Sequence, residues 1–398
     1  MNHKSAKTII IASLCQLAVP SLAQHKFADI MERPLILRQW GRESDVDSKG
    51  DIKHHNYSNN SETITFHANG TLDWNNKEKK LRYTYVIKSD TVAMTNAKDY
   101  WLKFFIPRRE RGGVNDNGYI GFKDTNGVYR YACPSEIDCY DLYLKCTAEK
   151  RYDAAFDYLL CASKSDSPLA LCALGYCYEN GIGVDVMKSD GNVSYMMATY
   201  HINVPLEEQQ RKFADTQKML VESGLMDKSL LDVKLEASKL ALDDRQKNIV
   251  LAFAYRRPAL NYMPKSRNEE DYDENLSDVM EDFSKAISAN NDAVSQFMLG
   301  RIYYEGLQGF AEKEQGLDLL NKAAAQNNIA ALGYLAEICE KRGQKSKAME
   351  YWQRAASQSI CKPVFSISRL STLASPNGDD KVNIQYLEKA RKKTGKLH

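Results

Sequence analysis

The chain has 398 residues, of which 43% are hydrophobic and 27% charged, and its formal net charge at pH 7 is +2. The first 23 residues hold two lysines and no acidic residue, so the rest of the chain has 52 basic and 52 acidic side chains. A chain in charge balance has no overall attraction to polyanions, which argues against a nucleic-acid-binding protein or one held to an anionic membrane by charge. The length suggests two or three structural units.

The first residues have the pattern of a secretory signal peptide. Lys4 and Lys7 precede an apolar stretch at residues 8–19, and a proline and a small-residue tail follow at residues 20–23. A positive start, a short apolar middle and a small-residue exit are the three parts of such a leader. We expect cleavage between Ala23 and Gln24. The stretch is too short to span a bilayer, and polar residues interrupt every later candidate, so no transmembrane segment is expected.

Residues 24–135 have the texture of short antiparallel strands separated by turns. Turn-forming residues stand at 68–71, 88–90 and 124–127. Between them lie segments rich in β-branched and aromatic residues, at 64–67, 72–74, 81–87, 91–94, 101–106, 119–122 and 128–131. This spacing predicts a small antiparallel sheet or barrel.

The order of short motifs in this part resembles the small lipocalin-like domains of secreted bacterial proteins. The motifs are Leu37-x-x-Trp40-Gly41, Ile64-Thr65-Phe66-x-x-Asn69-Gly70-Thr71 and Tyr85-x-Ile87-x-x-Asp90-Thr91-x-x-Met94. The resemblance implies a pocket for a small apolar ligand. The alternative is a filled barrel that serves as a structural or docking module, and it is favoured because small barrels are often packed solid.

After Cys139 the hydrophobic period becomes helical, and the sequence then repeats itself. The eight residues from Leu174 align with the eight from Leu299 and share Leu-Gly, Tyr and Gly at matching positions. The segment Lys322-Ala323-Ala324 is echoed by Arg354-Ala355-Ala356, and Asn291-Asp292-Ala293 by Asn328-Ile329-Ala330. Small residues let two antiparallel helices approach closely, and a glycine ends the first helix in a left-handed conformation. One hairpin cannot bury its own apolar face, so such repeats stack.

These residues resemble the Sel1-like repeat, a variant of the tetratricopeptide (TPR-like) hairpin. The signature residues are Leu174, Gly175, Tyr178, Gly181, Leu299, Gly300, Tyr303, Gly306, Ala323, Ala324, Ala355 and Ala356. The unit from Asn328 departs from the pattern, with Ala336-Glu337 in place of Leu-Gly. The leader and the repeat type together predict a secreted or periplasmic protein of a Gram-negative bacterial envelope.

The predicted fold class is therefore α+β and multidomain: a small antiparallel β domain followed by an α-solenoid of antiparallel helical hairpins. We place a first helical repeat block at residues 136–256, a loop at 257–275 and a second block at 276–398. Residues 205–256 are expected to be helical but do not follow the repeat pattern.

Eight cysteines remain beyond the leader, and their even number in an oxidising compartment favours disulfides. Buried free thiols that act as small hydrophobes are an equal alternative. The candidate pairs are Cys133 with Cys139, Cys146 with Cys161, and Cys339 with Cys361.

The usual catalytic and metal-binding motifs are absent from the sequence, including H-E-x-x-H, G-x-S-x-G and the phosphate-binding loop. We therefore expect no enzyme, no cofactor and no metal site. Tyr176 and Tyr304 lie on first helices and are candidates for contact with a partner, while Tyr178 and Tyr303 are expected to pack between helices.

The sequence favours an exported scaffold that binds an unidentified protein or peptide partner through the repeats. A carrier of a small apolar ligand in the β domain is the alternative. A hydrolase of cell-wall material, an activity claimed for some disulfide-rich members of the repeat family, ranks last because no nucleophile–base pair supports it.

Overall fold

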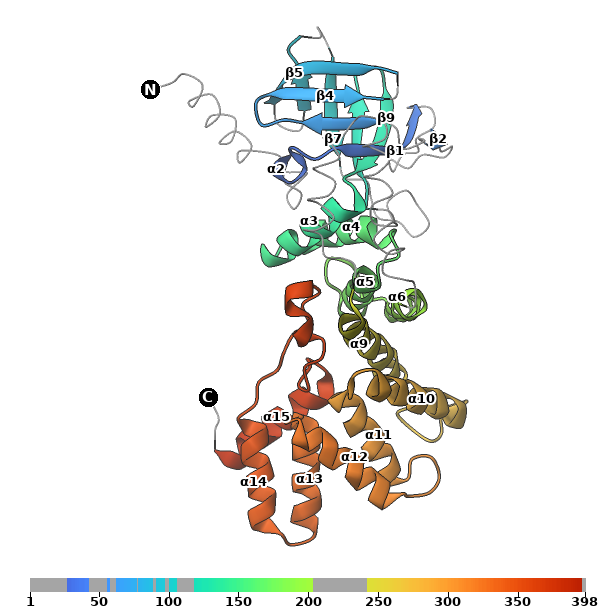
Figure 1. The fold of residues 1–398 in the computed structure, drawn as a ribbon, viewed down its shortest axis with the longest axis vertical. Helices are drawn as coiled ribbons and strands as arrows, with labels where there is room; N and C mark the ends of the chain where they lie inside the picture. The colour runs from blue at the N-terminus through green and yellow to red at the C-terminus, as the bar shows by residue number, and fades with distance from the viewer. Residues whose placement is uncertain are drawn as a thin grey trace. The chain divides into compact units, whose positions relative to one another are not determined.

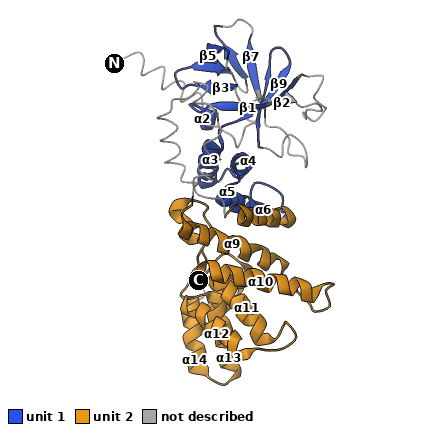
Figure 2. Ribbon diagram, turned by 45° about the vertical axis from the view of Figure 1, so that its right-hand side comes forward, with its two compact units in different colours: residues 1–187, 204–241 blue, residues 188–203, 242–398 orange. Residues whose placement is uncertain are grey.

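The computed structural model describes residues 27–42, 56–57, 62–76, 78–88, 91–96, 100–105, 118–202 and 242–395 (Figure 1). The predicted leader with its cleavage site at Ala23 and Gln24 lies outside these residues, and so does nearly all of the expected off-pattern helical segment before residue 242. The chain divides into two compact units (Figure 2), residues 1–187 with 204–241 and residues 188–203 with 242–398.

An antiparallel β barrel forms the N-terminal part of the first unit. Strands β3 to β9 pair each with the next, and β1 pairs with both β3 and β9, which closes the sheet, while β2 adds to β1. The strands are β1 Leu35–Arg42, β2 Asn56–Tyr57, β3 Thr63–Phe66, β4 Thr71–Asn75, β5 Lys80–Lys88, β6 Thr91–Met94, β7 Trp101–Phe105, β8 Ile120–Asp124 and β9 Val128–Cys133. The predicted antiparallel sheet or barrel is confirmed.

Several side chains of the barrel strands are buried and contact one another. Alternate residues of β4 are buried, Leu72 and Trp74, as the two-residue period of a strand requires. The ring of Phe27 stands edge-on to Phe66 and Tyr85, with centroid distances of 5.1 and 6.2 Å. This packing favours the filled barrel over the ligand pocket. The lipocalin resemblance itself stays a prediction.

Helices extend the first unit beyond the barrel: α2 Phe27–Ile30, α3 Glu136–Ala148, α4 Tyr152–Ser163 and α5 Pro168–Asn180. Buried Asp29 of α2 accepts hydrogen bonds from Lys145 at 2.8 Å and from Arg151 at 2.7 Å. Arg38 of β1 donates to Glu136 at 2.9 Å. The predicted border at residue 135 therefore separates strands from helices, but the barrel and these helices belong to one compact unit.

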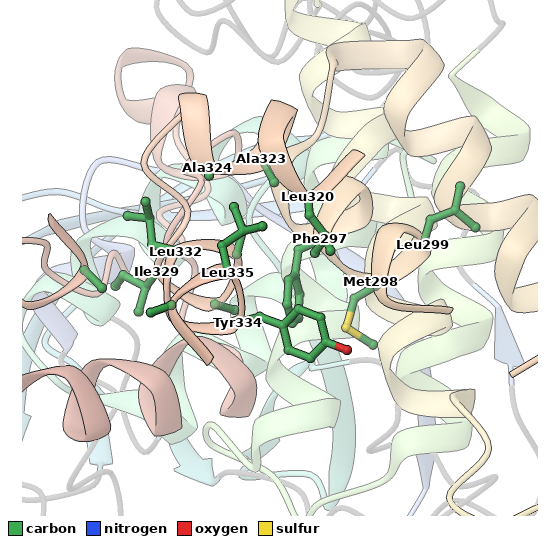
Figure 3. Close-up of a cluster of buried hydrophobic side chains, with 14 of the residues drawn as sticks. Phe297, Met298, Leu299, Leu320, Ala323, Ala324, Ile329, Leu332, Tyr334 and Leu335 are labelled. Carbon is green, nitrogen blue, oxygen red and sulfur yellow. The ribbon is translucent and has the colours of Figure 1, made fainter. Parts of the chain in front are cut away.

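The second unit is all-helical. Its elements are α6 Lys188–His201, α9 Asp244–Tyr262, α10 Tyr272–Asn290, α11 Ala293–Glu305, α12 Lys313–Ala325, α13 Ile329–Lys341, α14 Lys345–Ala356, the 3-10 helix η4 Ile367–Thr372, and α15 Lys381–Thr394. Helices α11 and α12 form one hairpin, α13 and α14 a second, and α15 packs against both helices of the second hairpin. Figure 3 shows their shared core, in which Ala323 and Ala324 of α12 lie over side chains of α11 and α13.

The loop predicted at residues 257–275 is too long at both ends. Helix α9 continues through Pro258 to Tyr262, and α10 begins at Tyr272, so the loop covers only residues 263–271. Pro258 removes a helical hydrogen bond, which normally ends a helix. Here two buried arginines anchor the last turns, since Arg256 pairs with Asp292 at 2.5 Å and Arg257 with Asp379 at 3.6 Å.

Helix caps set the register of the repeats. The side chains of Ser167, Asp292, Asn328 and Asp380 each accept a hydrogen bond from the backbone N–H three residues later, at the start of α5, α11, α13 and α15. Seven residues after each cap stands a buried leucine: Leu174, Leu299, Leu335 and Leu387.

This register corrects the sequence alignment of the third unit by one residue. Leu335-Ala336, and not Ala336-Glu337, takes the place of Leu299-Gly300. It also makes α15 the first helix of a further repeat. The left-handed glycines are confirmed, because Gly181 and Gly306 cap α5 and α11 with φ of 66° and 71°.

Candidate functional site

The first helices of three successive units, α11, α13 and α15, line a groove of about 630 Å³ in the second unit. Its lining residues are Arg301, Tyr304, Glu305, Tyr334, Glu337, Lys341, Val382, Gln385, Tyr386 and Lys389. Tyr334 and Tyr386 each stand six residues after their helix cap, so the repeat places equivalent aromatic side chains side by side on one face.

Hydrogen bonds and ring contacts fix the tyrosines of the groove. Tyr304 and Tyr334 meet edge to face with centroids 6.1 Å apart, and Tyr334 also packs against Phe297 of the core below it (Figure 3). The Tyr334 hydroxyl donates to Glu305 at 2.8 Å and the Tyr386 hydroxyl to Glu337 at 3.3 Å. Burial, together with the acceptor carboxylate, raises the pKa of both phenols, so they stay protonated donors at neutral pH.

The charges of the groove are largely paired. Arg301 bonds Glu305 at 2.9 Å, and Lys389 bonds Glu337. Within the described residues, Lys341 has no ion-pair partner. Arg342 beside it donates to the Tyr304 hydroxyl at 3.5 Å. The groove therefore offers aromatic faces next to an uncompensated positive edge.

Close helix approach positions two of the tyrosines. A Cβ added at Gly316 of α12 would lie 2.6 Å from the backbone nitrogen of Tyr304, and one at Gly333 of α13 would lie 2.3 Å from a ring carbon of Tyr386. Sequence reasoning missed both glycines because neither stands at a signature position. The only sign of them in the sequence is that each glycine interrupts a segment of good helix-forming residues.

The structure separates the two tyrosines proposed from sequence. Tyr304 lines the groove, and its contact with a partner stays a prediction. Tyr176 of α5 is only 8% exposed, so the expectation that its ring is open to a partner is wrong. Its helix, α5, belongs to the first unit, and residues 168–177 of this helix are all buried. Tyr178, expected to pack, contacts Phe156 of α4 with centroids 5.2 Å apart, and Tyr303 is partly buried against the core of the second unit.

None of the three proposed disulfides is formed among the cysteines that the structure describes. Cys133 and Cys139 do lie together, but with Cys161 as a third member, and the three sulfur atoms are within 4.8 Å of one another. The proposed pairing used Cys161 with Cys146 instead, because sequence spacing cannot show that the end of a strand meets α4. Cys339 is buried. Cys361 is half-buried, and its backbone forms an isolated parallel β-bridge with Gly378.

None of the described helices is long and apolar enough to cross a membrane. A second hollow in the helical unit, of about 910 Å³, lies beside the loop at residues 263–271 and the start of α10. Four acidic residues are part of its lining: Glu269, Asp271, Asp273 and Glu274. It lies outside the row of first helices that forms the groove.

The fold and the groove define a helical-hairpin repeat protein that carries an antiparallel β barrel at its N-terminal side. The hairpins are Sel1 repeats: the model of this repeat matches residues 168–190, 293–328 and 330–360, which include every signature residue predicted from sequence. Proteins built from Sel1 repeats are typically scaffolds for protein interaction and are generally non-catalytic. No curated protein matches the chain in sequence.

Two solved structures are similar to parts of the chain. One is a protective antigen present in uropathogenic Escherichia coli strains that displays an SLR fold, with 17% identity and a TM-score of 0.25 over 66% of this chain and 61% of that one. The chain thus spans less than two thirds of that protein. The other is a Sel1 repeat protein from Oxalobacter formigenes, with 16% identity and a TM-score of 0.26 over 65% of this chain and 88% of that one.

Proposed function

We propose that the protein is an exported scaffold that binds an extended segment of a protein partner in the groove of α11, α13 and α15. The observation that carries the proposal is the preformed aromatic groove on the row of first helices. Tyr304, Tyr334 and Tyr386 present large rings whose positions are already fixed by contacts within the protein. Binding therefore orders few side chains, and rigid aromatic anchors are typical of residues that dominate interface affinity.

The charges of the groove indicate what the partner brings. Two of its cations are already paired with Glu305 and Glu337, so Lys341 is the cation left to recognise an incoming group, with Arg342 beside it. A partner segment with an apolar or aromatic side chain for the tyrosines and a carboxylate for Lys341 fits this pattern. Charge complementarity at such an edge mainly governs the association rate and its dependence on salt.

The proposal of export rests on the leader predicted at residues 1–23, and an exported chain would meet its partner in the periplasm or outside the cell. The carrier alternative is the weaker one, because the rings of Phe27, Phe66 and Tyr85 are buried and pack edge-on against one another.

The test is capture of partners from the envelope fraction with the mature chain, residues 24–398, followed by calorimetric titration of the captured partner. Tyr304→Ala should weaken binding by at least about tenfold, as loss of an interface anchor does. Lys341→Glu should slow association and remove its salt dependence. Tyr262→Ala is the matched control, since Tyr262 is 59% exposed on α9 and is not part of the groove lining. Equal affinity for all four proteins would refute the assignment of the groove.

A further inference from the structure

Three elements of the first unit bring three cysteines to one point. Cys133 ends strand β9, Cys139 lies in α3 and Cys161 in α4. Their sulfur atoms all lie within 4.8 Å of one another, and the residues are 2%, 0% and 1% exposed. Three thiols from a strand and two helices meet where the barrel joins its helices, so the cluster is not a product of neighbouring sequence.

Two cationic side chains with anchored positions accompany the thiols. Arg38 donates to Glu136 at 2.9 Å, and Lys164 donates to the Tyr119 hydroxyl at 2.7 Å. Hydrogen bonds from the Cys139 and Cys161 thiols lower the pKa of Cys133 well below its ordinary value, and the charges of Arg38 and Lys164 act in the same direction. Burial raises the pKa of Cys139 and Cys161.

A polar atom beside the cluster is also unpartnered. Oxygen Oε2 of Glu136 is buried without a hydrogen-bond partner in the described part of the chain, while Oε1 accepts from Arg38. A buried carboxylate oxygen normally finds a donor or a cation, because leaving it without one is costly. Arg38 lies next to both Glu136 and Cys133, which places this carboxylate at the border of the thiol cluster.

A disulfide accounts for this arrangement less well than a metal ion does. A disulfide would use two sulfurs, leave the third buried, and need no neighbouring cation. Zinc binds thiolates at about 2.3 Å, which separates the sulfurs of a tetrahedral site by about 3.8 Å, within the spacing of the cluster. Thiolates select zinc and other soft ions over hard ones. Three thiolates around a divalent ion carry one net negative charge, which Arg38 and Lys164 offset.

We propose that Cys133, Cys139 and Cys161 form a buried site for one zinc ion, and that Glu136 supports the site through its hydrogen bond with Arg38. Zinc binds cysteine as the thiolate, so binding releases to solvent the protons that the thiols carry. Affinity therefore falls as the pH is lowered. The site does not depend on the groove of the second unit or on its proposed partner.

The experiment uses the mature chain, reduced and freed of metal under argon, with Zn²⁺ as the probe and Co²⁺ as its spectroscopic substitute. We expect one ion per chain, a sulfur-to-cobalt charge-transfer band, and three sulfur ligands by X-ray absorption of the zinc-loaded wild-type protein. Cys133→Ser and Cys161→Ser should each abolish the band. Glu136→Gln should weaken zinc binding by about 10- to 100-fold, the range seen when a residue that supports the metal ligands is lost.

Cys172→Ser is the matched control, because Cys172 is an equally buried thiol in α5 of the same unit, and this variant should bind like wild type. The X-ray absorption measurement needs no variant, so a folding failure of the serine proteins leaves the test intact. Zinc with fewer than three sulfur ligands, or no bound zinc when all thiols are free, would overturn the site. So would a Cys133–Cys139 disulfide that forms in zinc-containing buffer.

Discussion

At the residue scale, two glycines control how closely the helices of the second unit approach. The first, Gly316 of α12, faces Gly300 of α11, and a Cβ on either would lie 2.7 to 3.0 Å from the backbone oxygen of the other. The glycine of the Leu-Gly signature is therefore needed because a larger side chain does not fit between the two helices. It is not needed for an unusual backbone conformation, since both glycines are inside regular helices. The same contact fixes Tyr304 in the groove.

Gly316→Ala tests this packing because two effects of opposite sign compete. Alanine is the better helix former by about 1 kcal/mol. Its Cβ would meet backbone atoms of α11, which cannot rotate away, and overpacking costs about 1–3 kcal/mol beyond that gain. We expect a net loss of stability, measured by urea unfolding. Gly378→Ala is the control, since its Cβ would meet only Asp380 Oδ2 at 3.6 Å. A Gly316→Ala protein more stable than wild type would contradict the close approach.

Sequence reasoning worked best where one residue type has one physical role. The left-handed glycines at 181 and 306 and the buried alanines of α12 and α14 were predictable, because few residues fit those positions. Tyr176 was not, because a tyrosine on a first helix serves equally as a packing residue or a surface anchor. Gly316 and Gly333 were missed since their partners lie on other helices, and the thiol cluster was missed for the same reason.

At the element scale, an asparagine network joins the start of α13 to the start of α15. Asn383 Oδ1 accepts from the Ala330 N–H at 3.1 Å, and its Nδ2 donates to Asp380 at 2.9 Å. Asn377 Oδ1 accepts from the Ile329 N–H at 2.7 Å. Both N–H groups belong to the first turn of α13, where backbone N–H groups have no acceptor within the helix. This network holds α15 beside α13 and so completes the groove.

Asn383→Ala should therefore destabilise the second unit strongly. The change leaves the Ala330 N–H buried without an acceptor and removes the link to Asp380, a loss of about 2–4 kcal/mol. Asp243→Ala removes an exposed cap of α9 and should lose only about 1 kcal/mol. Chemical denaturation of the two variants measures the difference. Equal losses would show that the buried network adds nothing beyond ordinary capping.

The ends of helices and strands were predicted correctly where neighbouring residues determine them. They were predicted wrongly where contacts with distant parts of the chain determine them. Turn residues placed strands β3 to β9 within one or two residues, because a hairpin is a local structure, but they placed neither β1 nor β2. The end of α9 was misplaced because Pro258 is a local signal, while the ion pairs of Arg256 and Arg257 come from distant parts of the chain. The alignment of α13 slipped by one residue because the cap, and not the preceding asparagine, marks the equivalent position.

At the scale of the whole molecule, the chain divides into two compact units, and each holds one candidate site. The thiol cluster belongs to the first unit, and the groove belongs to the second. Units with their own cores generally unfold as separate cooperative transitions. Each site is then coupled to the stability of its own unit, because a ligand that binds only the folded state stabilises the unit that holds it.

Calorimetry of the mature chain should therefore show two transitions that respond independently. Zinc at about 100 times its dissociation constant should stabilise the first unit by about 2.7 kcal/mol, which raises that transition by several degrees. It should leave the second transition unchanged. Gly316→Ala should lower the second transition by about 2–4 °C for each kcal/mol lost and leave the zinc-dependent one in place. One transition that moves with both changes would mean that the units unfold together, and a partner bound in the groove would then stabilise the metal site as well.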